Sequence, residues 1–150
     1  MTEAIETETQ IKNLLASQKF AVLSTQEKYH PYLNLVAFTE ADDLCAILFA
    51  TTKATRKYGN ISSKSGVALL VDNRSNEAAD IREAMAVTVI GTACEVAESR
   101  RQELDGVYLA KQPHMKDFLS SPSTALIRVD VESYILVSRF QEVAVLNLKS

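Results

Sequence analysis

The chain has 150 residues, the size of one ordinary domain, and 47% of them are hydrophobic, which is enough for a packed core. Its formal net charge of −3 argues against nucleic acid as a partner, because nucleic-acid-binding proteins usually present a basic face. The N-terminus is acidic and has no apolar signal core, and no apolar run reaches membrane-spanning length. We therefore predict a single cytoplasmic domain over residues 1–150, with neither membrane nor nucleic acid among its partners.

The first third of the chain predicts one helix and three strands. Residues 5–18 place their apolar side chains on one helical face, with acidic residues in the first turns where the helix dipole favours them. Apolar segments at 20–24, 32–39 and 44–50 are separated by short polar turns. This spacing is typical of an antiparallel meander.

The next segment, residues 49–58, carries the most chemical information. It brings three hydroxyls and three cations into seven residues: Thr51, Thr52, Lys53, Thr55, Arg56 and Lys57. A short helix is predicted to follow, at about residues 57–64. A phosphate is bound by this combination of hydroxyl groups, backbone donors at a helix start, and cations. An exposed loop would also carry such residues, so both interpretations stand on composition alone.

The rest of the chain reads mainly as strands. We predict a strand at 67–71 that is buried on both faces, weak helical character at 77–84, and a long strand at 86–97 with a bulge at Gly91. Helices are predicted at 100–111, with Ser99 as N-cap and Gln102 completing a capping box, and at 113–119. Strands at 125–131 and 134–140 follow, and 143–148 is a candidate for one more. The fold class is mainly β, an antiparallel closed or split barrel of six to seven strands with flanking helices, because regular strand–helix alternation is missing.

Several kinds of site find no support in the sequence. The four glycines are too far apart for a nucleotide-binding fingerprint. His30 and His114 have no metal-type partner at helical or turn spacing, so we predict no metal site. Cys45 and Cys94 lie inside apolar runs, which predicts buried thiols and no disulfide.

An ordered set of segments resembles the pyridoxamine 5′-phosphate oxidase-like split-barrel family. The resemblance covers roughly residues 18–97, and the later helix and strands agree with the family's architecture. The segments are Phe20-Ala21-Val22-Leu23-Ser24-Thr25, His30-Pro31-Tyr32-Leu33-Asn34-Leu35-Val36, Ile47-Leu48-Phe49-Ala50-Thr51-Thr52, Thr55-Arg56-Lys57, Asn60-Ile61 and Val67-Ala68-Leu69-Leu70-Val71-Asp72.

The resemblance implies a homodimer with one flavin mononucleotide (FMN) at each end of the dimer interface. The family's Ser/Thr-Arg-Lys motif, here Thr55-Arg56-Lys57, would hold the flavin phosphate. Thr51 and Thr52 would lie beside the ribityl chain and phosphate. Asn34, Leu35 and Val36 would lie along the edge of the isoalloxazine ring, and Asn73 is a further, weaker candidate.

The chain departs from the oxidase proper on the substrate side. The Arg-x-x-x-x-Lys string of the second strand is replaced by Asn34-Leu35-Val36-Ala37-Phe38-Thr39. The Arg-Gln pair that enters the fifth strand is replaced by Met85-Ala86, and Arg139 is only a loose match for the C-terminal substrate arginine. We therefore expect flavin binding without pyridoxamine 5′-phosphate oxidase activity.

The leading hypothesis is an FMN-binding, flavin-dependent oxidoreductase of unknown substrate and without an assigned catalytic residue. The alternative is a non-enzymatic module on the same barrel that binds flavin or haem. Residues 136–140 loosely resemble the haem-handling branch, whose glycine-rich ending is absent. A deazaflavin needs the same phosphate site as FMN and stays open as a cofactor, and a structural homodimer with an empty pocket is a third possibility.

Overall fold

In the computed structural model, which describes residues 2–148, the chain forms seven strands and five α-helices. The strands are β1 (Phe20–Gln26), β2 (Pro31–Ala41), β3 (Ala46–Thr52), β4 (Gly66–Asp72), β5 (Ala86–Glu95), β6 (Thr124–Ser138) and β7 (Glu142–Asn147). The helices are α1 (Thr2–Ser17), α2 (Arg56–Ser63), α3 (Asp80–Glu83), α4 (Glu98–Lys111) and α5 (Lys116–Ser120), and a 3₁₀ turn, η1 (Pro113–Met115), precedes α5.

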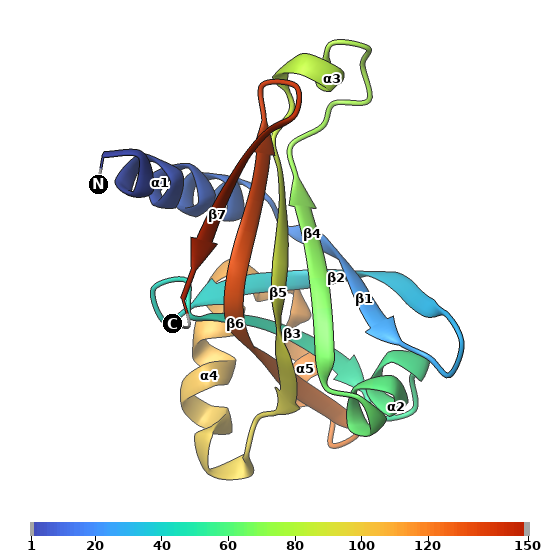
Figure 1. Cartoon of the computed structure of the whole chain (residues 1–150). Coiled ribbons are helices and arrows are strands. Elements are labelled where there is room, and N and C mark those ends of the chain that lie inside the picture. The colour runs from blue at the N-terminus through green and yellow to red at the C-terminus, as the bar shows by residue number, and fades with distance from the viewer. Residues whose placement is uncertain (1, 149–150) are drawn as a thin grey trace.

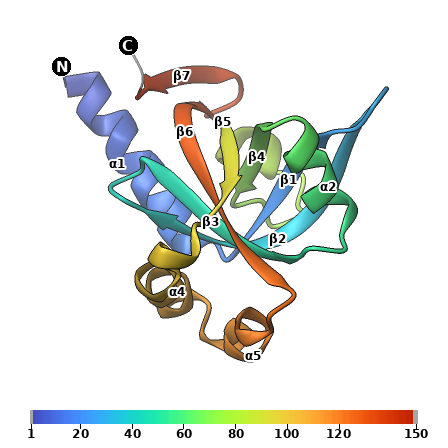
Figure 2. The ribbon, with the colours of Figure 1, turned by 90° about the horizontal axis from the view of Figure 1, so that it is seen from below.

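All seven strands belong to one antiparallel sheet in the order β3-β2-β1-β4-β5-β6-β7 (Figure 1). The sheet closes because β3 also pairs with β6, so that six strands form a barrel and β7 lies outside it. Seen from below, α2 lies at one side of the barrel and α4 and α5 at the other (Figure 2). The predicted antiparallel split barrel is confirmed, and so is the meander of its first three strands.

The barrel opens between β2 and β3. Their ladder runs from Ala41↔Ala46 to Phe38↔Phe49 and ends there. Beyond that point β2 continues along β1 as far as Pro31, while β3 continues along β6 as far as Thr52. The two strands therefore separate at the end of the barrel where the predicted phosphate-binding segment begins.

One long strand stands where the sequence predicts two. Residues 124–138 form the single strand β6, which pairs first with β3 and then, from Ser133, with β7. The polar residues near position 132 do not interrupt it, because β5 pairs with it on both sides of that point. The register shifts between Ile90 and Gly91, which confirms the predicted irregularity at Gly91.

The core fills the barrel, with side chains alternating between its inside and outside. The largest buried side chains include Phe38, Phe49, Leu69 and Tyr134. The prediction that residues 67–71 are buried on both faces is wrong, because alternate residues of β4 are only half-buried on its outer face. The predicted burial of Cys45 and Cys94 is also wrong: both are exposed, Cys94 because it alternates with the buried Ala93.

Helix boundaries differ in detail from those predicted. α4 begins at Glu98, and its N-cap is Ala97, which makes no side-chain capping bond; the predicted capping role of Ser99 is therefore wrong. The weak helix predicted at 77–84 shrinks to the four residues of α3. Among the described residues, no helix combines the length and apolar character that crossing a membrane would need.

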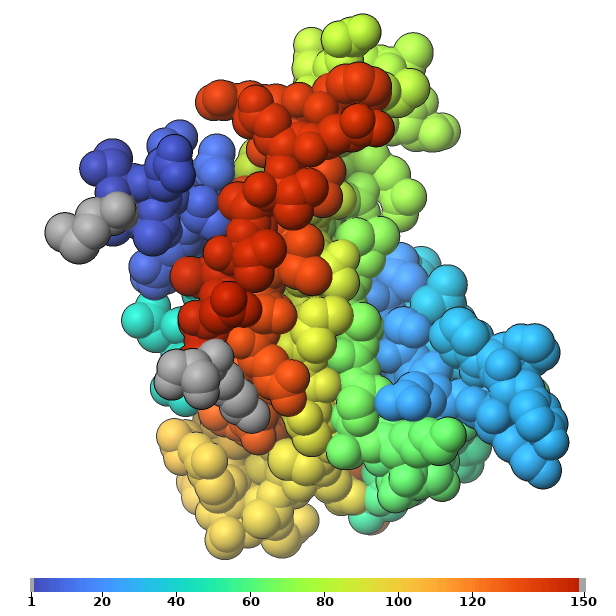
Figure 3. All heavy atoms as spheres, viewed as in Figure 1, coloured from blue at the N-terminus to red at the C-terminus, as the bar shows by residue number. Residues whose placement is uncertain are grey.

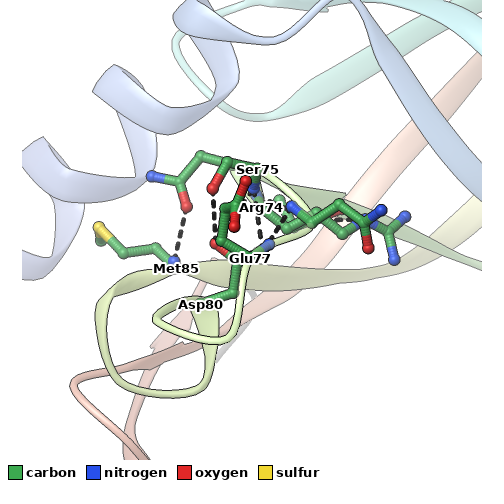
Figure 4. A network of polar contacts seen from close by, with 8 residues as sticks. Arg74, Ser75, Glu77, Asp80 and Met85 are labelled. Carbon is green, nitrogen blue, oxygen red and sulfur yellow. Dashed lines mark hydrogen bonds and ion pairs between the residues drawn. The ribbon is translucent and has the colours of Figure 1, made fainter.

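The segment between β4 and β5 protrudes from the end of the sheet opposite α2 (Figures 1 and 3). Its turn is built around Asp80, whose carboxylate accepts hydrogen bonds from the backbone N–H groups of Ser75, Asn76 and Glu77 at 2.7–3.1 Å (Figure 4). The Ser75 hydroxyl adds one more, at 3.0 Å. These bonds, first of all that of the Ser75 backbone, lower the pKa of Asp80 below its ordinary value of 3.8.

We expect Gly91→Ala to destabilise the protein. A Cβ atom there would lie 2.4 Å from the Asp130 carbonyl oxygen and 2.7 Å from Val129 Cγ1, so the β5–β6 bulge would have to shift. Overpacking of this kind costs about 1–3 kcal/mol, measurable by urea denaturation. Gly106→Ala in α4 is the matched control, because its Cβ meets nothing within 4 Å and a helix gains about 0.5–1 kcal/mol from Ala. Equal stability of the two variants would contradict this account of the bulge.

The protruding turn should loosen in acid. The pKa of Asp80 is lower in the folded than in the unfolded chain. The Asp80 carboxylate therefore stabilises the fold above pH 3.8, and this stabilisation is lost as the pH falls through the pKa of the folded chain. The backbone amide signals of residues 75–77 should therefore move together below pH 3.8 in an NMR titration. Asp80→Asn should abolish that transition, whereas Asp117→Asn in α5 should preserve it. Persistence of the transition in Asp80→Asn would refute the assignment.

Candidate functional site

Thr55 starts α2 and shapes the loop before it. Its backbone is extended, and its Oγ1 accepts a hydrogen bond from the Tyr58 backbone N–H at 3.2 Å, as threonine does at an N-cap. The hydroxyls of Thr51 and Thr55 lie 2.6 Å apart, and both lie within reach of the Thr52 carbonyl oxygen, at 3.0 and 3.1 Å. The protons of these two hydroxyls are thus used inside the loop, so Thr51 and Thr55 hold its shape.

Other donors remain at the start of α2. The first backbone N–H groups of an α-helix have no acceptor within the helix. Within residues 2–148, those of Arg56 and Lys57 make no hydrogen bond, and neither does the hydroxyl of Thr52. The helix start therefore presents two backbone donors and one hydroxyl beside its cations.

Two of the three cations in this segment already have carboxylate partners. Lys53 Nζ lies 3.6 Å from Glu95 Oε2. Arg56 Nε lies 3.2 Å from Glu27 Oε1, and its guanidinium lies over the Tyr32 ring, 5.1 Å from the centroid. The positive charge of these two side chains is partly balanced within the protein itself.

Lys57 differs from both of them. It is half-buried, burial lowers its pKa, and in the described part of the chain no carboxylate lies within ion-pair distance. A cation that loses hydration without gaining a counter-charge costs free energy, which an anion bound beside it would recover. The start of α2 therefore combines free backbone donors with a cation whose charge has no counter-charge in the described chain, which is the chemistry that an anion site requires.

The two sides of the barrel opening carry the other predicted residues. Thr51 and Thr52 end β3, and residues 34–36 lie in the part of β2 that has separated from it. Asn34 donates from Nδ2 to the Leu35 carbonyl oxygen at 3.3 Å, while its Oδ1 is buried and has no hydrogen-bond partner among residues 2–148. Val36 is buried in the core, and Leu35 points the other way and is 69% exposed.

Asn73 lies apart from this group. Its Oδ1 accepts a hydrogen bond from the Met85 N–H at 2.7 Å, and its own N–H donates to the Met85 carbonyl oxygen at 3.1 Å. It thus closes the neck of the protruding β4–β5 segment, at the far end of the sheet from α2 (Figure 1). Eight of the nine predicted residues therefore lie on the elements that border the opening, although Val36 faces the core and Leu35 the opposite side, and Asn73 of the same chain lies apart.

Sequence reasoning missed the residues that fix α2 in place. Asn60 donates from Nδ2 to the buried hydroxyl of Thr25 on β1, at 3.0 Å. Tyr58 donates its hydroxyl to Glu95 Oε1 at the end of β5, at 2.5 Å. No short-range pattern could have revealed these pairs, because the partners are 35 and 37 positions apart along the chain.

Both histidines are exposed, His30 in the β1–β2 turn and His114 in η1. The described residues contain no group of three or more His, Cys, Asp or Glu arranged to hold a metal ion.

Solved structures share the fold at low sequence identity. The heme binding protein from Mycobacterium smegmatis aligns with a TM-score of 0.83 and 13% identity over 93% of this chain. This chain spans only 57% of that protein's length. A FAD-binding protein from Mesorhizobium loti aligns with a TM-score of 0.69 and 15% identity, over 85% of this chain and 90% of its own. General Stress Protein 26 from Bacillus anthracis aligns with a TM-score of 0.73 and 19% identity, over 95% and 98%.

Family membership rests on the sequence itself. No curated protein gives a significant match to the chain. The family pattern described as pyridoxamine 5′-phosphate oxidase, however, matches residues 7–138, which include the whole barrel and the opening between β2 and β3. The chain belongs to the pyridoxamine 5′-phosphate oxidase family of split barrels.

Proposed function

We propose that this protein binds FMN at a homodimer interface and acts as a flavin-dependent oxidoreductase on a substrate yet to be identified. The observation that carries the proposal is Lys57, a half-buried cation without a carboxylate partner among the described residues, at a helix start whose backbone donors are free. This is the chemistry that the terminal phosphate of FMN requires. The cytoplasmic location stays a prediction from the sequence.

The residues at the barrel opening fit FMN in the following way. Lys57 and Arg56 would neutralise the phosphate, and their N–H groups with the Thr52 hydroxyl would donate to its oxygens. Thr51 and Thr55 would keep the loop in shape through their mutual hydrogen bond. Residues 34–36 of β2 would lie beside the isoalloxazine ring, where the buried Asn34 Oδ1 still lacks a donor. The bound flavin supplies the redox chemistry, while the protein sets orientation and solvent access.

The proposal excludes oxidation of pyridoxamine 5′-phosphate as the reaction. The family positions that would carry the oxidase's arginine and glutamine are Met85 and Ala86, at the neck of the β4–β5 protrusion. Arg139 lies exposed in the β6–β7 turn, with a positive φ of 44°. None of these three residues offers a cation beside Lys57, so we propose a substrate of different chemistry.

The outer face of the sheet supports the proposed homodimer. The register of the ladders places six residues of six successive strands in one row: Leu35, Val22, Leu70, Thr88, Ile135 and Val145. None of the six is buried, and Leu35 and Val145 are 69% and 55% exposed. A continuous apolar row on a surface marks an interaction site, and a second copy of the chain is the partner that the proposal requires.

A haem-binding or purely flavin-storing module is the second candidate. The observation that favours haem is the TM-score of 0.83 to a protein described as heme binding. The absorption spectrum of the purified protein distinguishes the candidates, because flavin gives two visible bands and haem gives a Soret band. Anaerobic reduction of the bound flavin by a nicotinamide cofactor would then separate an enzyme from a passive carrier. Mass spectrometry of the released cofactor would distinguish FMN from a deazaflavin.

We expect Lys57→Gln to weaken FMN binding about ten- to a hundredfold. A hydrogen bond to a charged group contributes about 1.5–3 kcal/mol, and about 1.4 kcal/mol corresponds to a factor of ten in affinity. Quenching of flavin fluorescence on titration into cofactor-free protein measures the change. Lys64→Gln removes the same charge at the other end of α2 and should leave the affinity unaltered. Equal affinities of Lys57→Gln and the wild type would exclude Lys57 from the phosphate site.

Leu35→Glu should convert the dimer to a monomer and reduce flavin retention with it. A carboxylate at the β2 end of this row would have to be desolvated for two copies to associate. Analytical ultracentrifugation measures the oligomeric state. Ile5→Glu, at an exposed apolar position of α1 outside the row, is the control and should remain dimeric. A dimeric Leu35→Glu variant would show that the interface lies elsewhere.

A further inference from the structure

Arg56 is held from two sides by residues of the β1–β2 hairpin. Glu27 Oε1 forms an ion pair with its Nε at 3.2 Å, and the Tyr32 ring lies against the guanidinium, 5.1 Å from centroid to Cζ. Within the described chain, the two terminal nitrogens of Arg56 make no hydrogen bond or ion pair. Its side chain is 63% exposed, so solvent and ligands can reach it.

The position of Glu27 is fixed by its backbone. It follows the last residue of β1, and its N–H donates to the His30 carbonyl oxygen at 3.0 Å, which closes the hairpin turn. The backbone that carries the Glu27 carboxylate to the start of α2 is therefore held by the hairpin. A fixed negative charge at a site for a phosphate dianion opposes binding, because like charges repel most strongly where solvent is partly excluded.

The other carboxylate beside the loop has a different task. Glu95 contacts Lys53 at 3.6 Å and also accepts the Tyr58 hydroxyl at 2.5 Å, so it fastens both the loop and the first turn of α2 to the end of β5. Among the described residues, the Glu27 side chain makes no such second contact with α2, and Arg56 is its one partner. Exchange of Arg56 away from Glu27 therefore costs the loop none of its structure.

Resting on the proposed flavin site, we propose that Glu27 is an internal competitor for the cofactor phosphate, and that Arg56 exchanges Glu27 for the phosphate when FMN binds. The Tyr32 ring keeps the guanidinium in place during the exchange, because a cation–π contact does not fix the direction of the N–H groups within the plane. Glu27 lowers the affinity for every phosphate ligand by the same factor, so the ratio of the FMN and inorganic phosphate affinities does not change. It raises the concentration at which either ligand occupies the site, and only a ligand that also gains contacts through its ring then binds at low concentration.

The test compares Glu27→Gln with the wild type, both freed of cofactor. Because exposed ion pairs contribute about 0.2–1 kcal/mol, we expect the variant to bind FMN about 1.4- to fivefold more tightly. Riboflavin, which has the ring but no phosphate, should bind both proteins equally. Inorganic phosphate, titrated as a competitor of FMN, should have an inhibition constant that is lowered by the same factor in the variant. Glu103→Gln, which removes one negative charge on α4, should match the wild type in all three titrations.

Other results of these titrations would contradict the proposal in the following ways. FMN affinity that is unchanged or lower in Glu27→Gln overturns the competition and assigns Glu27 a positioning role for Arg56. A gain for riboflavin as large as that for FMN also overturns it, because the phosphate would then not be the group involved. If Glu27→Gln does not fold, Glu27→Ala removes the same charge and carries the same expectation. Failure of the wild type to bind FMN overturns the proposed function itself, and the competition with it.

Discussion

The separation of β2 from β3 is the constraint on which the site depends. β3 pairs with β6 along its whole length, from Ala46↔Asp130 to Thr52↔Thr124, and this pairing closes the barrel. β2 stays with β1 along the hairpin and leaves β3 after Phe38↔Phe49. A strand pair that parts leaves backbone groups on both sides available, which a closed ladder would have used. The barrel therefore opens at this point, and the loop that leads into α2 begins where β3 ends.

The second constraint is electrostatic. Three cations within five residues would repel one another, and the fold pairs two of them with carboxylates from β5 and from the β1–β2 turn. Lys57 alone among the three has no such partner in the described chain, and burial lowers its pKa. One of these pairs also fixes α2, since Glu95 accepts a hydrogen bond from Tyr58 as well as pairing with Lys53. Glu95 therefore serves the structure of the loop, whereas Glu27 balances the charge of Arg56.

Several features could be predicted from the sequence because their causes are local. The short helix predicted at about residues 57–64 is present as α2 (Arg56–Ser63), which Thr55 caps with its hydroxyl. Gly91 inside a β-branched run predicted an irregular register, and the register shifts at Gly91. The strands approach there so closely that a Cβ atom would collide with the Asp130 carbonyl. Local signals failed where distant pairing decided the outcome. The polar residues near position 132 look like a turn, yet β5 continues beside them and keeps β6 a single strand.

By itself, the sequence determined the strand content, the family resemblance and the cluster of hydroxyls and cations at residues 51–57, because each follows from side-chain types and short-range spacing. Tertiary structure alone decided which of those groups remain available to a ligand. The hydroxyls of Thr51 and Thr55 bind each other, Arg56 meets Glu27, and Lys57 meets no carboxylate in the described residues. Asn73, adjacent to a barrel strand in sequence, lies at the far end of the sheet because β4 carries it there. The physical reason is the same in each case. A charge or a hydrogen-bond donor stays available to a ligand only if the fold brings no counter-charge or acceptor beside it.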